Sequence, residues 1–65
     1  MGRGYGRDIE RLLRAAGCTF VRQAKGDHEI WRSPITNRHF VFDRGVTLRH
    51  TANGILADAG LSKAF

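Results

Sequence analysis

Two segments of the sequence repeat apolar residues at the spacing of an amphipathic helix, i, i+3, i+4 and i+7. In the first segment these residues are Ile9, Leu12, Leu13 and Ala16. In the second they are Ala52, Ile55, Leu56 and Ala59. The pattern predicts helices over residues 7–16 and 51–59, each followed by a glycine that can end it. Thr51 is expected to cap the second helix, because its hydroxyl can accept a backbone N–H.

The residues between the helices predict three short strands, over 18–24, 28–33 and 38–43, because β-branched and aromatic residues gather there. Turn-forming residues separate the strands at 25–27 and 36–37. Connections this short join antiparallel neighbours. The alternation leaves two apolar sets open as the buried face of the sheet, either Phe20, Ile30, Phe40 and Phe42 or Val21, Trp31 and Val41.

The element order is therefore α-β-β-β-α, and two helices with an apolar stripe must cover one face of the sheet. This arrangement is an α+β two-layer sandwich, the layout of double-stranded-RNA-binding-type domains. A single domain is expected over residues 7–61. Residues 1–6 are expected to form a flexible N-terminal tail and residues 62–65 a C-terminal tail that frays, unless Phe65 folds back.

Charge narrows the choice of partners. The 65 residues carry 11 basic and 6 acidic side chains, a net charge of +5, and arginine supplies nine of the eleven cations. Arginine binds phosphate in bidentate fashion, so the composition favours a nucleic acid as partner.

A chain this short excludes a second domain and a deep cofactor cavity. The one cysteine excludes an internal disulfide, and no apolar run is long enough to span a membrane, so the cytoplasm is the expected location.

The first predicted hairpin carries the strongest candidate for chemistry. His28 follows the turn residue Gly26, which lets a phosphate approach the backbone closely. Arg22, Lys25 and Arg32 flank it, and the two arginines are expected to meet across the strands. Cleavage of RNA without a metal needs this combination of a proton-transfer group and cations that stabilise the phosphorane. Taken alone the signal is weak, because a histidine on a hairpin is more commonly an ordinary surface residue.

Other candidate sites are weaker. The zinc-protease pattern that starts at His28 lacks its second histidine, since Arg32 stands at that position, and no other histidine or cysteine has paired metal-ligand spacing. No metal or other cofactor is therefore expected. Asp27, Glu29 and Asp43 could bind Mg²⁺, but scattered carboxylates on a basic domain more commonly balance charge.

Two further features could contact RNA. Arg49 begins an Arg-His-Thr run where the second helix starts, a place that favours anions. The aromatic residues could stack on bases, with Trp31 as the best candidate for an exposed platform, although so small a core favours their burial.

The order of these motifs resembles the HicA family of toxins. The resemblance rests on a helix that ends in Ala-Gly, then Val21-Arg22-Gln23, Lys25-Gly26-Asp27-His28, Trp31 and Pro34. The Leu-Arg-His-Thr-Ala-Asn-Gly-Ile-Leu-Ala-Asp-Ala-Gly-Leu run of residues 48–61 is similar to the family's last helix. The similarity covers about residues 7–61.

The resemblance implies a small mRNA interferase with a double-stranded-RNA-binding-like fold, held inactive by a HicB-like antitoxin. It implies that His28 is the catalytic residue, in the position of the histidine of the family's Gly-Ser-His turn. Two departures stand out. Asp27 replaces the serine, which places a negative charge beside the phosphate site, and residues 43–47 lack the lysines that many members carry before the last helix.

The hypothesis from the sequence is an endoribonuclease that cleaves RNA without a metal ion, with specific residues predicted for catalysis and for RNA binding. His28 is predicted to move the 2′-OH proton, and the RNA-binding residues are predicted to be Arg22, Lys25, Gly26, Arg32 and Arg49. His39 and His50 are the candidates for the second proton carrier. The alternatives are a non-catalytic RNA-binding module of the same fold and an interaction protein whose basic face binds an acidic partner.

Overall fold

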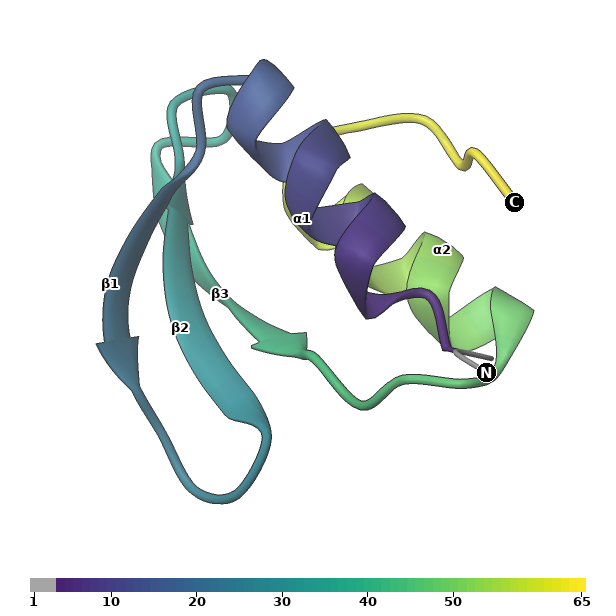
Figure 1. Cartoon of the computed structure of the whole chain (residues 1–65). Helices are drawn as coiled ribbons and strands as arrows, with labels where there is room; N and C mark the ends of the chain where they lie inside the picture. Colours follow the sequence, from purple (N-terminus) through teal and green to yellow (C-terminus); the bar gives the residue numbers. More distant parts are fainter. Residues whose placement is uncertain (1–3) are drawn as a thin grey trace.

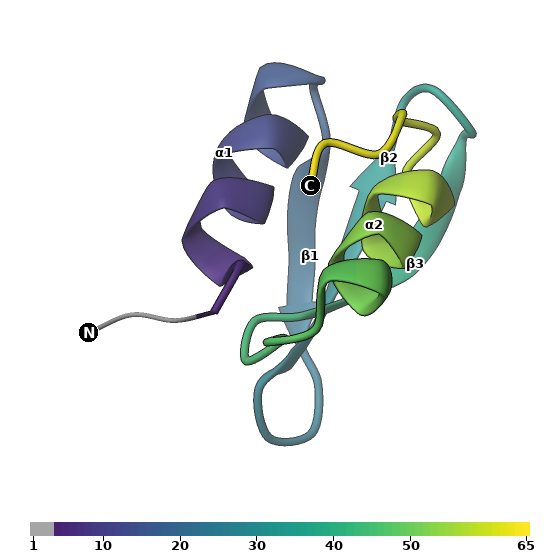
Figure 2. The same cartoon turned by 90° about the vertical axis from the view of Figure 1, so that its right-hand side faces the viewer.

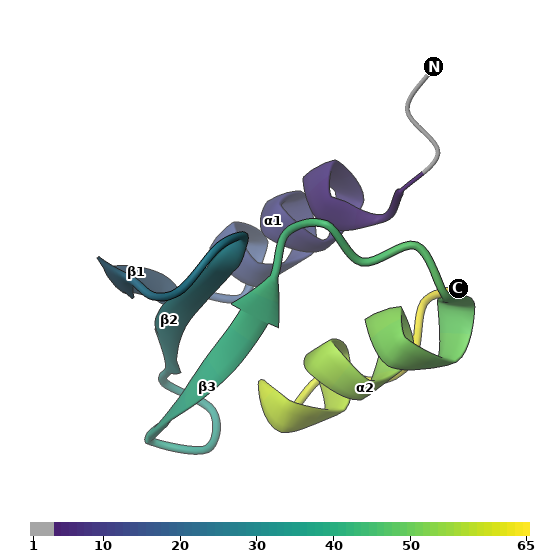
Figure 3. The same ribbon diagram turned by 90° about the horizontal axis from the view of Figure 1, so that it is seen from below.

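Two helices cover one face of a three-stranded antiparallel sheet in the computed structural model, which describes residues 4–65 (Figure 1). The elements are α1 (Gly6–Ala15), β1 (Thr19–Gln23), β2 (His28–Ser33), β3 (Arg38–Asp43) and α2 (Arg49–Asp58). Figures 2 and 3 place both helices on the same side of the sheet. The predicted α-β-β-β-α order and the two-layer α+β architecture are confirmed.

The second helix begins two residues earlier than the sequence pattern predicts. Its N-cap is Leu48, which has an extended backbone and makes no side-chain cap. The carbonyl of Leu48 accepts the N–H of Ala52 at 2.9 Å, so Thr51 already lies inside the first turn. The prediction of a Thr51 cap is wrong, because the helical hydrogen bonds already begin at the Leu48 carbonyl.

Strand register decides which face of the sheet is buried. In the antiparallel pairing Trp31 lies opposite Phe40 on one side and opposite Phe20 on the other. Residues directly opposite one another share a face. The face toward the helices is formed by buried Glu29, Trp31, Ser33, Phe40 and Phe42. Both apolar sets that the sequence left open are therefore wrong, because the register places Trp31 with Phe40 rather than Ile30 with Phe40.

The core lies between this face and the helices. Its members are Ile9, Leu13, Cys18, Trp31, Phe40, Phe42, Val46, Ala52, Ile55, Leu56 and Ala59. Trp31 is fully buried at the centre, edge-on to Phe42 at 5.9 Å and to Phe20 at 6.1 Å between ring centroids. The burial that the sequence favours for the aromatic residues is thus confirmed for Trp31, and because a buried indole cannot stack on a base, its alternative role as an exposed platform is excluded.

The ends of the described chain pack against the domain. The Tyr5 N–H donates to the carbonyl of Val46 at 3.0 Å, and the Phe65 ring lies 4.8 Å from the Tyr5 ring. Asn53 accepts the N–H groups of Ala64 and Phe65 at 3.1 Å through its side-chain oxygen. These contacts hold Tyr5, Ala64 and Phe65 against the domain, so Phe65 folds back, which is the alternative to fraying that the sequence left open. The part of the predicted N-terminal tail over residues 1–3 lies outside the described residues. Within residues 4–65, no helix has the length and apolar character needed to cross a membrane.

Candidate functional site

The second face of the sheet is open, because both helices lie on the other side (Figure 3). Three rows of residues cross it, as the pairing of the strands dictates. The rows are His28–Asp43, Arg22–Ile30–Val41 and Thr19–Arg32–His39. This open face therefore combines aliphatic residues at its centre with cations and histidines around them.

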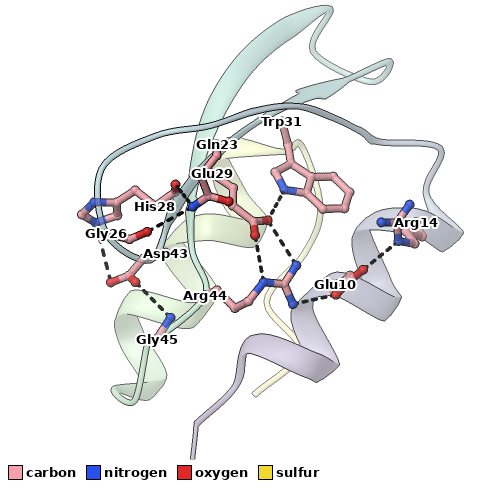
Figure 4. Close-up of polar contacts among 10 residues, drawn as sticks. All are labelled: Glu10, Arg14, Gln23, Gly26, His28, Glu29, Trp31, Asp43, Arg44 and Gly45. Carbon is pink, nitrogen blue, oxygen red and sulfur yellow. Dashed lines mark hydrogen bonds and ion pairs between the residues drawn. The ribbon is translucent and has the colours of Figure 1, made fainter.

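The turn between β1 and β2 supports one end of the open face. Gly26 has a φ of 60°, a left-handed conformation that glycine adopts without strain, and nothing lies within 4 Å of where its Cβ would be. The Gln23 carboxamide donates to the carbonyls of Gly26 at 3.1 Å and His28 at 3.0 Å (Figure 4). The sequence analysis missed these two hydrogen bonds from Gln23. The signal in the sequence was a glutamine three and five residues before the carbonyl groups to which it donates.

His28 is the first residue of β2 and presents an accessible imidazole. Its side chain is 52% exposed, and its Nε2 atom lies 3.9 Å from Oδ2 of Asp43 in the facing strand. The other carboxylate oxygen of Asp43 accepts the Gly45 N–H at 3.0 Å (Figure 4). The imidazole thus has a carboxylate on one side and solvent on the other.

The predicted RNA-binding cations are only partly brought together. Arg22 lies opposite Ile30, which makes it a diagonal neighbour of His28 at about 7–8 Å. Arg32 lies opposite Thr19, and its guanidinium donates to the Asn37 carboxamide. The predicted meeting of Arg22 and Arg32 is wrong, because a register shift after Phe20 places the two arginines in different rows.

The remaining predicted cations lie elsewhere. Lys25 and Gly26 belong to the β1–β2 turn itself, beside His28. Arg49 is the first residue of α2, in the helical layer rather than on the open face. The structure therefore places Arg22, Lys25 and Gly26 nearest to His28, with Arg32 further along the same strand.

Comparison with known proteins decides the family. The family model described as "HicA toxin of bacterial toxin-antitoxin" matches residues 6–61 of the chain. The chain belongs to the HicA toxin family. Searches of curated proteins and of solved structures found no significant match. Membership of a toxin–antitoxin family implies an antitoxin as partner of this HicA toxin.

Directly beneath the open face, a polar network links the sheet of this HicA-family chain to its first helix. Arg44, which follows β3, donates to Glu29 at 3.0 and 3.1 Å and to Glu10 of α1 at 2.6 Å (Figure 4). The Trp31 indole N–H donates to Glu29 at 2.9 Å, and Arg14 donates to Glu10 at 2.9 Å. We call these five residues the Arg44 network.

The Arg44 network holds its carboxylates in the ionised form. Hydrogen bonds from Arg44 hold the pKa of Glu29 below its ordinary value, against the effect of burial, and they also lower the pKa of Glu10. The same bonds raise the pKa of Arg44. The guanidinium also lies 5.0 Å from the centroid of the Phe42 ring, a cation–π contact.

The network reaches the catalytic candidate through the backbone. The Arg44 N–H donates to the carbonyl of Asp27 at 3.0 Å, so the segment after β3 is bonded to the turn that carries His28. Sequence analysis assigned Glu29 to charge balance or a Mg²⁺ site and gave Arg44 no role. Their partners lie 15 and 34 residues apart in the sequence, so no local pattern could indicate them.

The other titratable candidates lie apart from His28. His39 shares the open face, but its row lies four positions along β2 from that of His28, a distance of about 13 Å. His50 is exposed in the first turn of α2. Across residues 4–65 no three side chains capable of metal binding come together.

Proposed function

We propose that this HicA-family chain is an mRNA interferase, an endoribonuclease that cleaves RNA by histidine acid–base chemistry without a metal. The observation that supports this function best is the position of His28. Its imidazole is exposed at one end of an uncovered, cationic sheet face, with Arg22 as a diagonal neighbour and Lys25 in the adjoining turn. A general base and cations for phosphate are thus available to a single phosphodiester.

In the proposed reaction His28 takes the proton from a ribose 2′-OH as the 2′ oxygen attacks the adjacent phosphorus. The bond from phosphorus to the 5′ oxygen breaks, that oxygen takes a proton from water, and His28 returns its proton to solvent. The products are a 2′,3′-cyclic phosphate and a 5′-OH end. The distance of about 13 Å between the rows of His28 and His39 makes His39 a poor donor of the second proton.

The cations have separate places in this proposal. Arg22 and Lys25 are close enough to His28 to stabilise the charge that develops on the phosphorane. Gly26 leaves the turn open to close approach of a phosphate. Arg32 would bind a phosphate further along the strand, and Arg49 would act only if the RNA also crosses to the helical layer.

The partner that neutralises the toxin is proposed to be a HicB-like antitoxin, which is what the family implies. A partner that covers the open face would cover His28 as well, because the histidine forms the end row of that face.

One observation favours a second candidate, a non-catalytic RNA-binding module. Asp43 lies 3.9 Å from His28, and the Asp27 carboxylate reaches within 2.8 Å of where a Cβ on Gly45 would be. The Asp43 carboxylate beside the imidazole and the Asp27 carboxylate near Gly45 oppose the approach of a phosphate. If they dominate, RNA would bind through Arg22 and Arg32 without being cleaved.

Cleavage of a long mixed-sequence RNA in EDTA, with His28→Ala beside the unmodified protein, separates the two functions. The interferase predicts fragments with 2′,3′-cyclic phosphate and 5′-OH ends, and their loss in His28→Ala. The binding module predicts no fragments from either protein, together with a log–log salt slope of affinity of about −1.4 for phosphate contacts by Arg22 and Arg32. Cleavage that survives in His28→Ala would contradict the proposed chemistry.

A further inference from the structure

We propose that Asp43 is a positioning residue for His28, which holds the neutral imidazole with its proton on Nε2 and leaves Nδ1 free as the base. This inference rests on the proposed function, because it names the group through which His28 is prepared for the reaction. Neither the sequence analysis nor the family match assigns Asp43 this role.

The strand register brings the two side chains together. His28 and Asp43 lie directly opposite one another at the end of the β2–β3 ladder, so both side chains project from the open face. Oδ2 of Asp43 lies 3.9 Å from Nε2 of His28 (Figure 4). Contacts of catalytic groups are commonly longer before substrate binds and shorten in the complex.

Asp43 is fixed on its other side. Its Oδ1 atom accepts the Gly45 N–H at 3.0 Å, which leaves Oδ2 as the oxygen that faces the imidazole. The segment is fixed again by the bond between the Arg44 N–H and the Asp27 carbonyl. The carboxylate therefore has one oxygen bound to the backbone and one available to His28.

The chemistry follows from what each atom can donate or accept. An ionised carboxylate only accepts hydrogen bonds, so an imidazole nitrogen that faces it is best satisfied when it carries the proton. The lone pair then lies on Nδ1, which can take the 2′-OH proton. Once the imidazole is charged, Asp43 also stabilises the imidazolium.

Two substitutions at Asp43 distinguish positioning from a merely structural role, because the two roles predict opposite rankings of the variants' rates of cleavage. Asp43→Asn keeps an oxygen for the Gly45 N–H and turns its NH₂ group toward Nε2. A donor at that place favours the other tautomer, with the lone pair directed away from substrate. Asp43→Ala loses the bond to Gly45 but imposes no tautomer. Positioning predicts that Asn is the slower variant, whereas a structural role predicts that Ala is the slower one.

The experiment measures kcat and KM for a short RNA with both variants, and with Asp58→Asn as the control. Asp58→Asn removes the same charge from an exposed site at the end of α2. We expect Asp43→Asn to lower kcat by more than about tenfold with KM changed by less than about threefold, and Asp43→Ala to lower kcat less. The control should match the unmodified protein. Equal kcat values for Asp43→Asn and the unmodified protein would overturn the proposal.

A second readout does not depend on cleavage. Nitrogen chemical shifts of His28 at about pH 8.5, where an imidazole is neutral, report which nitrogen carries the proton. We expect the proton on Nε2 in the unmodified protein and on Nδ1 in Asp43→Asn. The same tautomer in both proteins would refute the inference even if RNA is cleaved. If no RNA is cleaved but the tautomer changes, the proposed function fails and the role of Asp43 stands.

Discussion

Replacing Glu29 with glutamine exchanges a carboxylate oxygen for an amide nitrogen at the centre of the Arg44 network. Glu29 accepts three hydrogen bonds, two from Arg44 at 3.0 and 3.1 Å and one from the Trp31 indole at 2.9 Å. A glutamine has one oxygen for these three donors, and its NH₂ group must face either the guanidinium or the indole N–H. At least one of these three donors loses its partner in the protein.

The magnitude follows from exposure. The Glu29 side chain is 11% exposed and that of Arg44 is 38% exposed. Breaking a fully buried ion pair costs about 3–5 kcal/mol, but water can reach Arg44, so we expect a loss of about 2–3 kcal/mol. A domain of this size is stable by roughly 3–10 kcal/mol in total, so the loss is a large share of the free energy of unfolding.

Urea unfolding at pH 7, followed by Trp31 fluorescence, measures this loss. With a slope of about 1 kcal/mol per molar urea, the midpoint should fall by about 2 M, and the melting temperature by about 10–20 °C. Asp8→Asn is the matched control, because Asp8 forms an exposed i,i+3 pair with Arg11 at 3.1 Å. That exposed pair is expected to contribute about 0.5 kcal/mol or less.

The loss should also depend on pH in a fixed direction. Hydrogen bonds from Arg44 place the folded-state pKa of Glu29 below the ordinary value of 4.5, so the unfolded chain binds its proton more readily. The stability from this carboxylate is present above about pH 4.5 and is lost as the pH falls below it. The difference between the unmodified protein and Glu29→Gln should therefore shrink in acid.

Two results would refute this reasoning. A midpoint of Glu29→Gln within about 0.5 M urea of the unmodified protein would mean that the network adds little net stability. A difference that stays constant from pH 7 to well below the ordinary glutamate pKa would mean that the ionised carboxylate is not its source.

Four further substitutions test other parts of the structure. Gly6→Ala should lower the free energy of unfolding by about 2 kcal/mol, because its Cβ would clash with the Arg44 carbonyl oxygen. Gly54→Ala should raise the free energy of unfolding by about 0.5–1 kcal/mol, because nothing lies within 4 Å of its Cβ. Thermal unfolding of both variants measures these changes. Arg22→Gln should weaken RNA binding and reduce the salt slope by about 0.7, measured by titration at several salt concentrations. His39→Ala should keep kcat within about twofold, and a loss beyond tenfold would contradict its distance from His28.

The fold could be predicted from the sequence where local patterns carry it. The apolar spacing of both helices and the turn residues between the strands gave the element order. The buried face of the sheet could not be predicted, because it depends on register, and alternation alone is satisfied by either face. The register shift after Phe20 has no glycine or proline to indicate it, and it separates Arg22 from Arg32.

The candidate site could be predicted only in part for a similar reason. His28, Lys25 and Gly26 lie within one turn, so sequence proximity is spatial proximity. Asp43 contributes to the same site from the facing strand, 15 residues further along the chain, and only the pairing of β2 with β3 shows it. An aspartate can bind a metal ion or balance a nearby positive charge, so its residue type alone does not indicate that Asp43 faces His28.

Successive side chains of β2 point to opposite faces of the sheet, so residues that stabilise the core alternate with residues of the proposed site. Glu29, Trp31 and Ser33 face the helices and are buried, whereas His28, Ile30 and Arg32 lie on the open face. Adjacent residues of β2 thus contribute to the core on one face of the strand and to the proposed site on the other. The bond from the Arg44 N–H to the Asp27 carbonyl links the Arg44 network on the buried face to the turn that carries His28. Substitutions on the buried face should therefore change the free energy of unfolding first and kcat only as the turn loosens. Substitutions on the open face should change RNA binding or cleavage in a protein that remains folded.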